Sequence, residues 1–345
     1  MKRRPHGGYP LYPASNHYDP IRRRFFNPEP KRRLQPLDFG GAFKMLSRQG
    51  RFPAQPLPFA KPDFAAFMRQ EGLPENERSE FRQNELGEFL HSKNEQKARF
   101  VWFGHSTLLI RVAGRNILTD PVFGMSAAPN ELPPLDIILY SHNHYDHLEE
   151  SFVRSVADSG VHFLVPLGME VLLRRWGVKA ENISAADWYQ SHTVGGVTFT
   201  ATPARHDSSR NLADHNRMLW AGWAVEGGGQ RLYFSGDSSY GSHFADIGRH
   251  FGGFDLAFME NGQYDRRWPD NHMFPGQTVQ AAIDVGARRM MPIHWGAFSL
   301  AMHDWDEPVR RSIPLAIERG LPVLTPLIGQ VFDADTETEL WWEEV

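Results

Sequence analysis

The chain has 345 residues and a formal net charge of −4, and 41% of its residues are hydrophobic while 23% are charged. This composition is ordinary for a globular protein, and no apolar run approaches the roughly 18 to 20 residues that a membrane span needs. Cysteine is absent, which excludes disulfides, thiolate zinc ligands and cysteine nucleophiles. The first residues lack the apolar region of a secretory signal, so we expect a cytoplasmic protein.

Basic residues are concentrated at the start of the chain. Residues 1–33 hold nine Lys or Arg against two acids, whereas the last thirteen residues hold six acids and no base. A basic arm can favour an anionic membrane surface, at roughly 1 kcal/mol per basic residue near it. We favour a solvated extension wrapped over the main domain, with peripheral membrane contact as the alternative. A nucleic-acid partner is not expected.

The chain changes character at Ala98. Residues 1–60 are rich in proline and aromatic residues without periodicity, and 62–98 have a polar helical pattern, so we predict an N-terminal extension over 1–97. Short β-runs then alternate with helical patterns. We expect helices at 149–159, 168–177, 275–285 and 307–319. We expect strands at 98–103, 107–112, 116–119, 136–141, 161–165, 193–202, 218–226, 230–235, 254–259, 288–293 and 328–332.

Strand meanders mixed with βα units, repeated in two halves, predict the fold class of residues 98–345. Such a pattern fits an α/β protein built as a four-layer αββα sandwich. Two sheets pack face to face in this architecture, and helices cover both outer faces.

The most informative segment directly follows the predicted strand 136–141. His142, His144, Asp146 and His147 place four ligand-type side chains within six residues. Imidazole and carboxylate together suit zinc and similar divalent ions. A loop at the carboxyl end of a strand has a rigid base and faces a crevice. The alternative is a turn that happens to be polar, and distant ligands would decide between the two.

Three later strand patterns also end in ligand-type residues. The run 199–206 ends in His206, the run 231–237 ends in Asp237, and His294 follows the strand predicted at 288–293. Each of these residues, taken singly, is more often a core or loop residue than a ligand. Seven such residues at four strand ends together predict a metal site.

In these residues the chain resembles the metallo-β-lactamase superfamily. It is also similar to the N-acyl-phosphatidylethanolamine-hydrolysing phospholipase D family, whose signatures recur from about residue 100 to residue 308, with looser similarity back to 50–53. The segments that carry this second resemblance are 101–107, 118–123, 141–148, 236–240 and 293–298. The resemblance implies the same four-layer sandwich, with a metal site at one edge between the sheets.

The resemblance further implies two divalent ions, which we expect to be zinc, with manganese or iron as alternatives. Asp237 would bridge them. Each ion would have three ligands of its own: His142, His144 and His206 for one, and Asp146, His147 and His294 for the other. A water shared by two cations loses a proton near neutral pH and becomes a nucleophile.

Further residues are expected to support this site. A ligating histidine needs an acceptor for its second ring N–H, and Asp120 is the expected acceptor, with a turn aspartate before proline as the alternative. His105 is either a buried structural histidine near the site or a donor to it. The family has a histidine at the place of His272, which implies a general acid for the leaving alcohol. A capping or surface histidine is the alternative.

The substrate pocket is less defined by the sequence. Tyr240 and Tyr264 are candidate walls, and Arg266 could hold an anionic oxygen. Four aromatic residues could line an approach for acyl chains, although aromatics so close to strands are more often core: Trp220, Trp223, Trp295 and Phe298. The run 259–268 departs from the family pattern, because Glu260 and Gln263 replace small or apolar residues at the expected pocket edge.

We therefore predict a dinuclear metal-dependent phosphodiester hydrolase with Asp146, Asp237 and His272 as catalytic residues. The resemblance implies phospholipase D-type cleavage of an N-acyl-phosphatidylethanolamine-like phospholipid by a hydroxide that bridges the ions. The residues themselves support only a phosphodiester or similar ester. The alternatives are a lactonase or cyclic phosphodiesterase acting on a soluble sugar phosphate or nucleotide, and a non-catalytic binding module on the same fold.

Overall fold

The computed structural model describes residues 11–12, 14–27, 29, 57–63, 97–123, 132–211, 213–298 and 300–345. The helical pattern expected over 62–98 lies outside these residues except at its two ends, and so does most of the expected arm. The division at residue 97 therefore stays a prediction. The described part of the arm contains a small antiparallel hairpin of β1 (Tyr18–Asp19) and β2 (Arg24–Phe25).

The first main layer is a seven-stranded sheet in the order β15-β3-β4-β5-β6-β7-β8. Strands β3, β4, β5 and β15 pair antiparallel, whereas β5, β6, β7 and β8 run parallel. Their bounds are Arg99–Trp102 for β3, Leu108–Val112 for β4, Arg115–Thr119 for β5, Ile137–Leu139 for β6, His162–Pro166 for β7, Ile183–Ala186 for β8 and Val331–Phe332 for β15.

The second main layer is a six-stranded sheet in the order β14-β13-β12-β11-β10-β9. It is antiparallel from β9 to β12 and parallel from β12 to β14. The strands are β9 (Ser191–Val194), β10 (Val197–Thr202), β11 (Gly222–Gly227), β12 (Gln230–Phe234), β13 (Leu256–Glu260) and β14 (Met290–Ile293).

Alternating apolar side chains hold the layers together. On β3, Phe100 and Trp102 face the core between the sheets, whereas Val101 packs on the outer face with α4 and α5. This period of two is what a strand with both faces buried requires. The second sheet behaves alike, since Phe258 faces the inner core and Met259 faces α6, α7 and α8.

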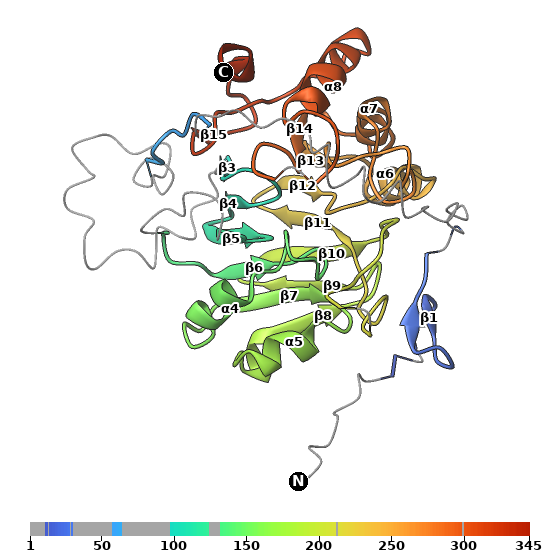
Figure 1. Ribbon diagram of the computed structural model, residues 1–345. Coiled ribbons are helices and arrows are strands. Elements are labelled where there is room, and N and C mark those ends of the chain that lie inside the picture. Colours follow the sequence, from blue (N-terminus) through green and yellow to red (C-terminus); the bar gives the residue numbers. More distant parts are fainter. Residues whose placement is uncertain are drawn as a thin grey trace, which may run out of the picture.

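Helices cover both outer faces, as Figure 1 shows, with α4 and α5 beside the first sheet and α6, α7 and α8 beside the second. The helices are α4 (Glu150–Val156), α5 (Glu170–Arg175), α6 (His243–Phe251), α7 (Pro275–Asp284) and α8 (Glu307–Glu318), and short 3-10 turns occur at Ala180–Asn182 and Trp341–Glu344. The expected four-layer αββα sandwich is therefore confirmed. Among the described helices, none has the length and apolarity needed to cross a membrane.

One local prediction was wrong, and two elements were not predicted. The strand expected at 193–202 is a hairpin, because Gly195 and Gly196 take positive φ values and turn the chain between β9 and β10. Strand β8 was not predicted, since three of its four residues are only partly buried and give no clear alternation. Helix α6 was not predicted either; it is nine residues long and contains Gly248, which packs against the backbone of Asp284.

Candidate metal centre

The ligand-type residues meet at one edge of the sandwich, beyond the carboxyl ends of four strands from the two sheets. The 142–147 loop follows β6, and the loops after β10, β12 and β14 bring His206, Asp237 and His294. Backbone hydrogen bonds close the seam between the sheets: His294 N donates to His105 O at 2.9 Å, and Ala221 N donates to Ser141 O at 2.9 Å. The structure thus brings all seven predicted residues into one site.

Three histidines form one cluster with ring nitrogens turned toward one another. His142 Nε2 lies 2.9 Å from His144 Nδ1, and His206 Nε2 lies 3.2 Å from the same atom. The opposite nitrogen of each ring meets an oxygen. His206 Nδ1 donates to Asn271 O at 3.0 Å, and His144 Nε2 lies 3.3 Å from Asp207 Oδ1.

His142 completes this pattern through Ser141. Its Nδ1 lies 2.9 Å from Ser141 Oγ, and that hydroxyl donates its own hydrogen to Asp120. His142 Nδ1 must therefore carry the hydrogen. Since the outward nitrogens donate, all three inward nitrogens present lone pairs to the same point. Burial lowers the pKa of His142 and of His206 well below the usual value, with the neighbouring imidazoles adding to the effect at His142.

A second cluster lies beside the first. His147 Nε2 and His294 Nε2 are 3.2 Å apart, and each lies 3.6 Å from Asp146 Oδ2. His105 Nε2 lies 3.0 Å from Asp146 Oδ2, and the His105 ring packs on His294 with 4.0 Å between centroids. Burial lowers the pKa of His105 to about 3. His105 is therefore a neutral donor to Asp146.

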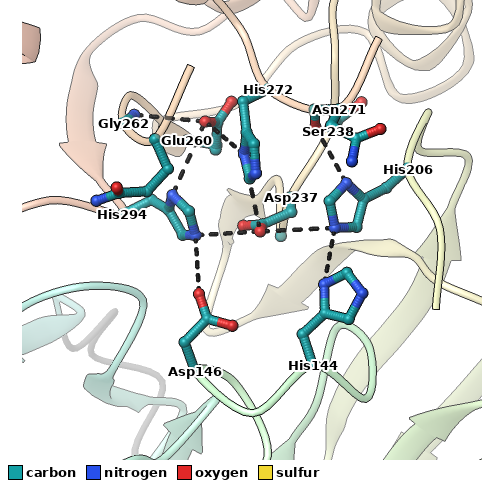
Figure 2. A network of polar contacts seen from close by, with 12 residues as sticks. His144, Asp146, His206, Asp237, Ser238, Glu260, Gly262, Asn271, His272 and His294 are labelled. Carbon is teal, nitrogen blue, oxygen red and sulfur yellow. Dashed lines mark hydrogen bonds and ion pairs between the residues drawn. The ribbon is translucent and has the colours of Figure 1, made fainter. Parts of the chain in front are cut away.

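Asp237 occupies the centre of the two clusters, as Figure 2 shows. Its Oδ2 lies 3.1 Å from His294 Nε2, 3.2 Å from His147 Nε2 and 3.7 Å from His206 Nε2. Burial alone would raise the pKa of this carboxyl, but His147 and His294 hold it well below its usual value. Asp237 therefore stays ionised, and one oxygen faces both clusters.

The donor set fits divalent cations. Nitrogens that bind zinc at about 2.0–2.1 Å in a tetrahedron lie roughly 3.3 Å apart, and the three-histidine cluster has two such separations, of 2.9 and 3.2 Å. Buried lone pairs at this distance repel unless a cation lies between them. Asp237 Oδ1 is also buried without a hydrogen-bond partner. The lowered pKa values of His142 and His206 and the ionised Asp237 give ligand forms that zinc requires. Although burial opposes it, Asp237 and Asp146 raise the pKa of His147, and that of His294 to about 9, so these two rings would release a proton on binding a cation.

Asp120 supports this centre from behind. It is fully buried, and its Oδ2 accepts from His147 Nδ1 at 2.7 Å while its Oδ1 accepts from Ser141 N at 2.7 Å. The carboxylate thus fixes the His147 ring so that Nε2 faces Asp237. Asp120, His105 and His294 have positive φ values of 35°, 51° and 68°. Such left-handed non-glycine residues cluster at functional sites, where the surrounding structure compensates for their strain.

His272 lies at the edge of the centre, beside a carboxylate. Its Nδ1 lies 3.2 Å from Glu260 Oε1 and 3.9 Å from Asp237 Oδ2. Glu260 is the last residue of β13, and its Oε2 accepts from Met273 N at 3.0 Å. The expectation that Glu260 and Gln263 form the pocket edge is wrong, because their exposed fractions are 0% and 3%. Gln263 instead holds the loop after His294, through hydrogen bonds to Phe298, Leu300 and Ala301.

The candidate pocket residues are not held together as a group. Tyr264 donates to Glu307 on α8 at 2.9 Å, and Tyr240 donates to Asp284 on α7 at 2.6 Å. Arg266 is exposed. Their role at a pocket stays a prediction.

The suggested approach for acyl chains is wrong for its three tryptophans. Trp220, Trp223 and Trp295 are at most 1% exposed within the inner core. Phe298 is partly buried and meets the His105 ring edge-on at 4.7 Å.

Four supporting residues were missed by sequence analysis. Asp207 follows His206, and Asn271 precedes His272, so adjacency to a candidate residue was the available signal for both. Glu260 has the same signal as Asp237, namely an acid at the end of a strand. Asn27 gave none, because it lies in the arm and reaches the site only in the folded chain, where its side chain bonds to the backbone of His206.

Comparison with known proteins agrees with this geometry. A family model described as a beta-lactamase superfamily domain matches residues 115–295. An uncharacterised protein of Mycobacterium tuberculosis is 41% identical over 263 residues, which cover 70% of this chain and 70% of that protein. N-acyl-phosphatidylethanolamine-hydrolyzing phospholipase D 1 of Caenorhabditis elegans is 34% identical over 233 residues, covering 59% of this chain and 65% of that protein.

Solved structures agree on the fold. Igni18, a metallo hydrolase from the archaeon Ignicoccus hospitalis, has a TM-score of 0.57 at 19% identity, covering 71% of this chain and 100% of that one. The chain therefore belongs to the metallo-β-lactamase superfamily as a metal-dependent hydrolase, and it is similar to the N-acyl-phosphatidylethanolamine-hydrolysing phospholipases D.

Proposed function

We propose that the protein is a dinuclear phosphodiesterase of the phospholipase D type, with an N-acyl-phosphatidylethanolamine-like phospholipid as substrate. The observation that carries this proposal is the position of Asp237 Oδ2, between 3.1 and 3.8 Å from the inward nitrogens of four histidines in two adjacent clusters. One carboxylate so placed can serve two cations. His142, His144 and His206 would hold one ion, and Asp146, His147 and His294 would hold the other.

The protein's own residues define the chemistry. Divalent ions held there would place positive charge beside a phosphoryl oxygen and lower the pKa of an attacking water. Asp237 keeps its negative charge at the centre. His272 bonds to Glu260 through Nδ1. In its protonated form the ring would also carry a hydrogen on Nε2, which it would give to the leaving alcohol oxygen, returning to the neutral imidazole. A phosphodiester needs both functions, because charge develops on the phosphoryl oxygens and on the leaving oxygen.

The lipid substrate is supported by similarity to the Caenorhabditis elegans phospholipase D, whose matched region reaches 65% of that protein. The competing substrates are soluble cyclic phosphodiesters and lactones, which suit the same metal arrangement. A side-by-side assay separates them. We expect detergent-dispersed N-acyl-phosphatidylethanolamine to be cleaved to N-acylethanolamine and phosphatidic acid with the higher kcat/KM, and a preference for a soluble cyclic phosphodiester or a lactone would refute the lipid assignment.

Substitutions test the site itself. We expect His144→Ala and Asp237→Ala to abolish hydrolysis of bis(p-nitrophenyl) phosphate and to lower the metal content of the purified protein. His162→Ala is the matched control, since His162 lies on β7 and bonds to Ser184 rather than to the centre. Full activity in either site variant would overturn the assignment. Metal analysis of the wild-type protein should give two ions per chain, and one ion would refute the dinuclear proposal.

A further inference from the structure

The N-terminal arm reaches the metal centre through one side chain. Asn27 Nδ2 donates to His206 O at 2.9 Å, and His206 N donates to Asn27 Oδ1 at 3.2 Å. A side-chain amide that bonds to both the backbone N–H and the backbone C=O of one residue acts as a neighbouring strand would. It therefore fixes the position and rotation of that backbone. The residue fixed in this way carries an inward nitrogen of the three-histidine cluster, although it lies 179 positions later in the chain.

The segment that carries His206 needs such support. Residues 203–221 connect β10 to β11 without helix or strand among their described members. Their positions therefore depend on scattered hydrogen bonds, such as that from Ser208 Oγ to Met218 O at 2.6 Å. The same segment holds Asp207, which lies 3.3 Å from His144 Nε2. A shift of this segment would disturb two of the three histidines at once.

The arm itself is firmly seated on both sides of Asn27. Phe25 is 2% exposed, packs with Tyr18 at 5.0 Å between ring centroids, and donates its backbone N–H to Asn216 O at 2.7 Å. On the other side, Glu29 Oε1 accepts from Ser242 Oγ at 2.6 Å. These contacts hold Asn27 against the 203–221 segment in the folded chain.

We propose that Asn27 is a positioning residue of the metal centre, and that docking of the N-terminal arm is coupled to retention of the ion held by His142, His144 and His206. The amide orients the His206 backbone so that Nε2 meets the other two inward nitrogens. The inference rests on the proposed function only in taking this cluster as a cation site. Residues that orient metal ligands typically change metal affinity by about 10- to 100-fold when they are replaced.

Metal titration tests the coupling. Co²⁺ would be titrated into metal-free full-length protein against a competing chelator and followed by its visible absorption. Asn27→Asp keeps the side-chain shape but loses the N–H donor and places a charge against His206 O. We expect it to lower the affinity for one of the two bound ions by about 10- to 100-fold. Asn27→Ala should do the same, and the second ion should keep its wild-type affinity.

Ser242→Ala is the matched control, because it removes the hydroxyl hydrogen bond to Glu29 while keeping the backbone one and leaving Asn27 and His206 in contact. We expect both ions to bind it as they bind the wild type. Equal weakening in Ser242→Ala and Asn27→Asp would overturn the specific role of Asn27, and so would wild-type affinity for both ions in the two Asn27 variants.

A second measurement reports on the hydrogen bond directly. The His206 amide should exchange with deuterium faster in Asn27→Ala than in the wild type, while the β10 amides keep their protection. Unchanged exchange at His206 would also overturn the proposal. Because neither measurement contains substrate, failure of the phosphodiester assignment would leave both results interpretable.

Discussion

Replacement of Asp120 by asparagine should damage the metal centre from a position that touches no ion. The Asp120 carboxylate receives three hydrogens, from His147 Nδ1, Ser141 N and Ser141 Oγ. An asparagine of the same shape offers one acceptor oxygen, and its NH₂ group must face at least one of these donors. If the NH₂ group faces Ser141 N, the buried backbone N–H of Ser141 loses its acceptor. Facing His147, it drives the hydrogen on that ring to Nε2, which removes the lone pair from the centre.

The magnitude follows from either orientation. An unpaired buried donor costs about 1–3 kcal/mol, and a tenfold change in a binding constant corresponds to about 1.4 kcal/mol. We therefore expect Asp120→Asn to lower the binding affinity for one metal ion by about 10- to 100-fold, in agreement with the range found for residues that orient metal ligands. Hydrolysis at limiting metal should fall in proportion.

The assay is a chelator-competition titration of the Asp120→Asn protein, with hydrolysis of bis(p-nitrophenyl) phosphate measured at limiting and saturating metal. Asp136→Asn is the control. Asp136 lies at the amino end of β6, whereas the ligand loop follows the carboxyl end, and its carboxylate accepts from Arg115 at 3.0 Å. Wild-type affinity for both ions in Asp120→Asn would refute this reasoning, as would an equal loss in the control.

Three further predictions concern other parts of the centre and its surroundings. Glu260→Gln should lower turnover about tenfold or more for substrates with alkyl leaving groups and little for p-nitrophenyl esters, which leave without a proton from His272; equal losses on both substrates would contradict this. Gly236→Ala should lower the free energy of unfolding in urea by about 1–3 kcal/mol, because a Cβ would lie 2.6 Å from Ser141 Cβ at a φ of 55°; wild-type stability would contradict it. Burial lowers the pKa of His243 from 6.5 to about 3, so the unfolded chain takes up a proton below pH 6.5 that the native chain does not. Stability should therefore fall toward acid by up to about 1.4 kcal/mol per pH unit, and His243→Gln should flatten this slope in metal-free protein; an unchanged slope would count against it.

The sequence was informative wherever the signal was local. The candidate ligands follow strand patterns in the sequence. His142, His206 and His294 could therefore be predicted without knowing which strands pair. The short β-runs from residue 98 onward likewise indicated strands between helical patterns. A four-layer sandwich follows from such strands alternating with helices.

The missed features depend on contacts between distant segments. Glu260 looked like a substitution at a pocket edge, but β13 lies between β12 and β14, and this central position buries the side chain against His272. Asn27 could not be connected with His206 because nothing in the arm specifies where it docks. The hairpin of β9 and β10 is different, since Gly195-Gly196 is a turn signal that was present and was passed over.

The seam between the two sheets has a consequence for how the protein would acquire the proposed ions. Each histidine cluster takes members from both layers: the loop after β6 belongs to the first sheet, and the loops carrying His206 and His294 belong to the second. During synthesis on the ribosome, the first half of the chain would thus emerge with only partial coordination. Stable uptake of the two proposed cations would wait until residue 294 has left the exit tunnel and the layers have joined, so a loaded metal centre would indicate completed assembly.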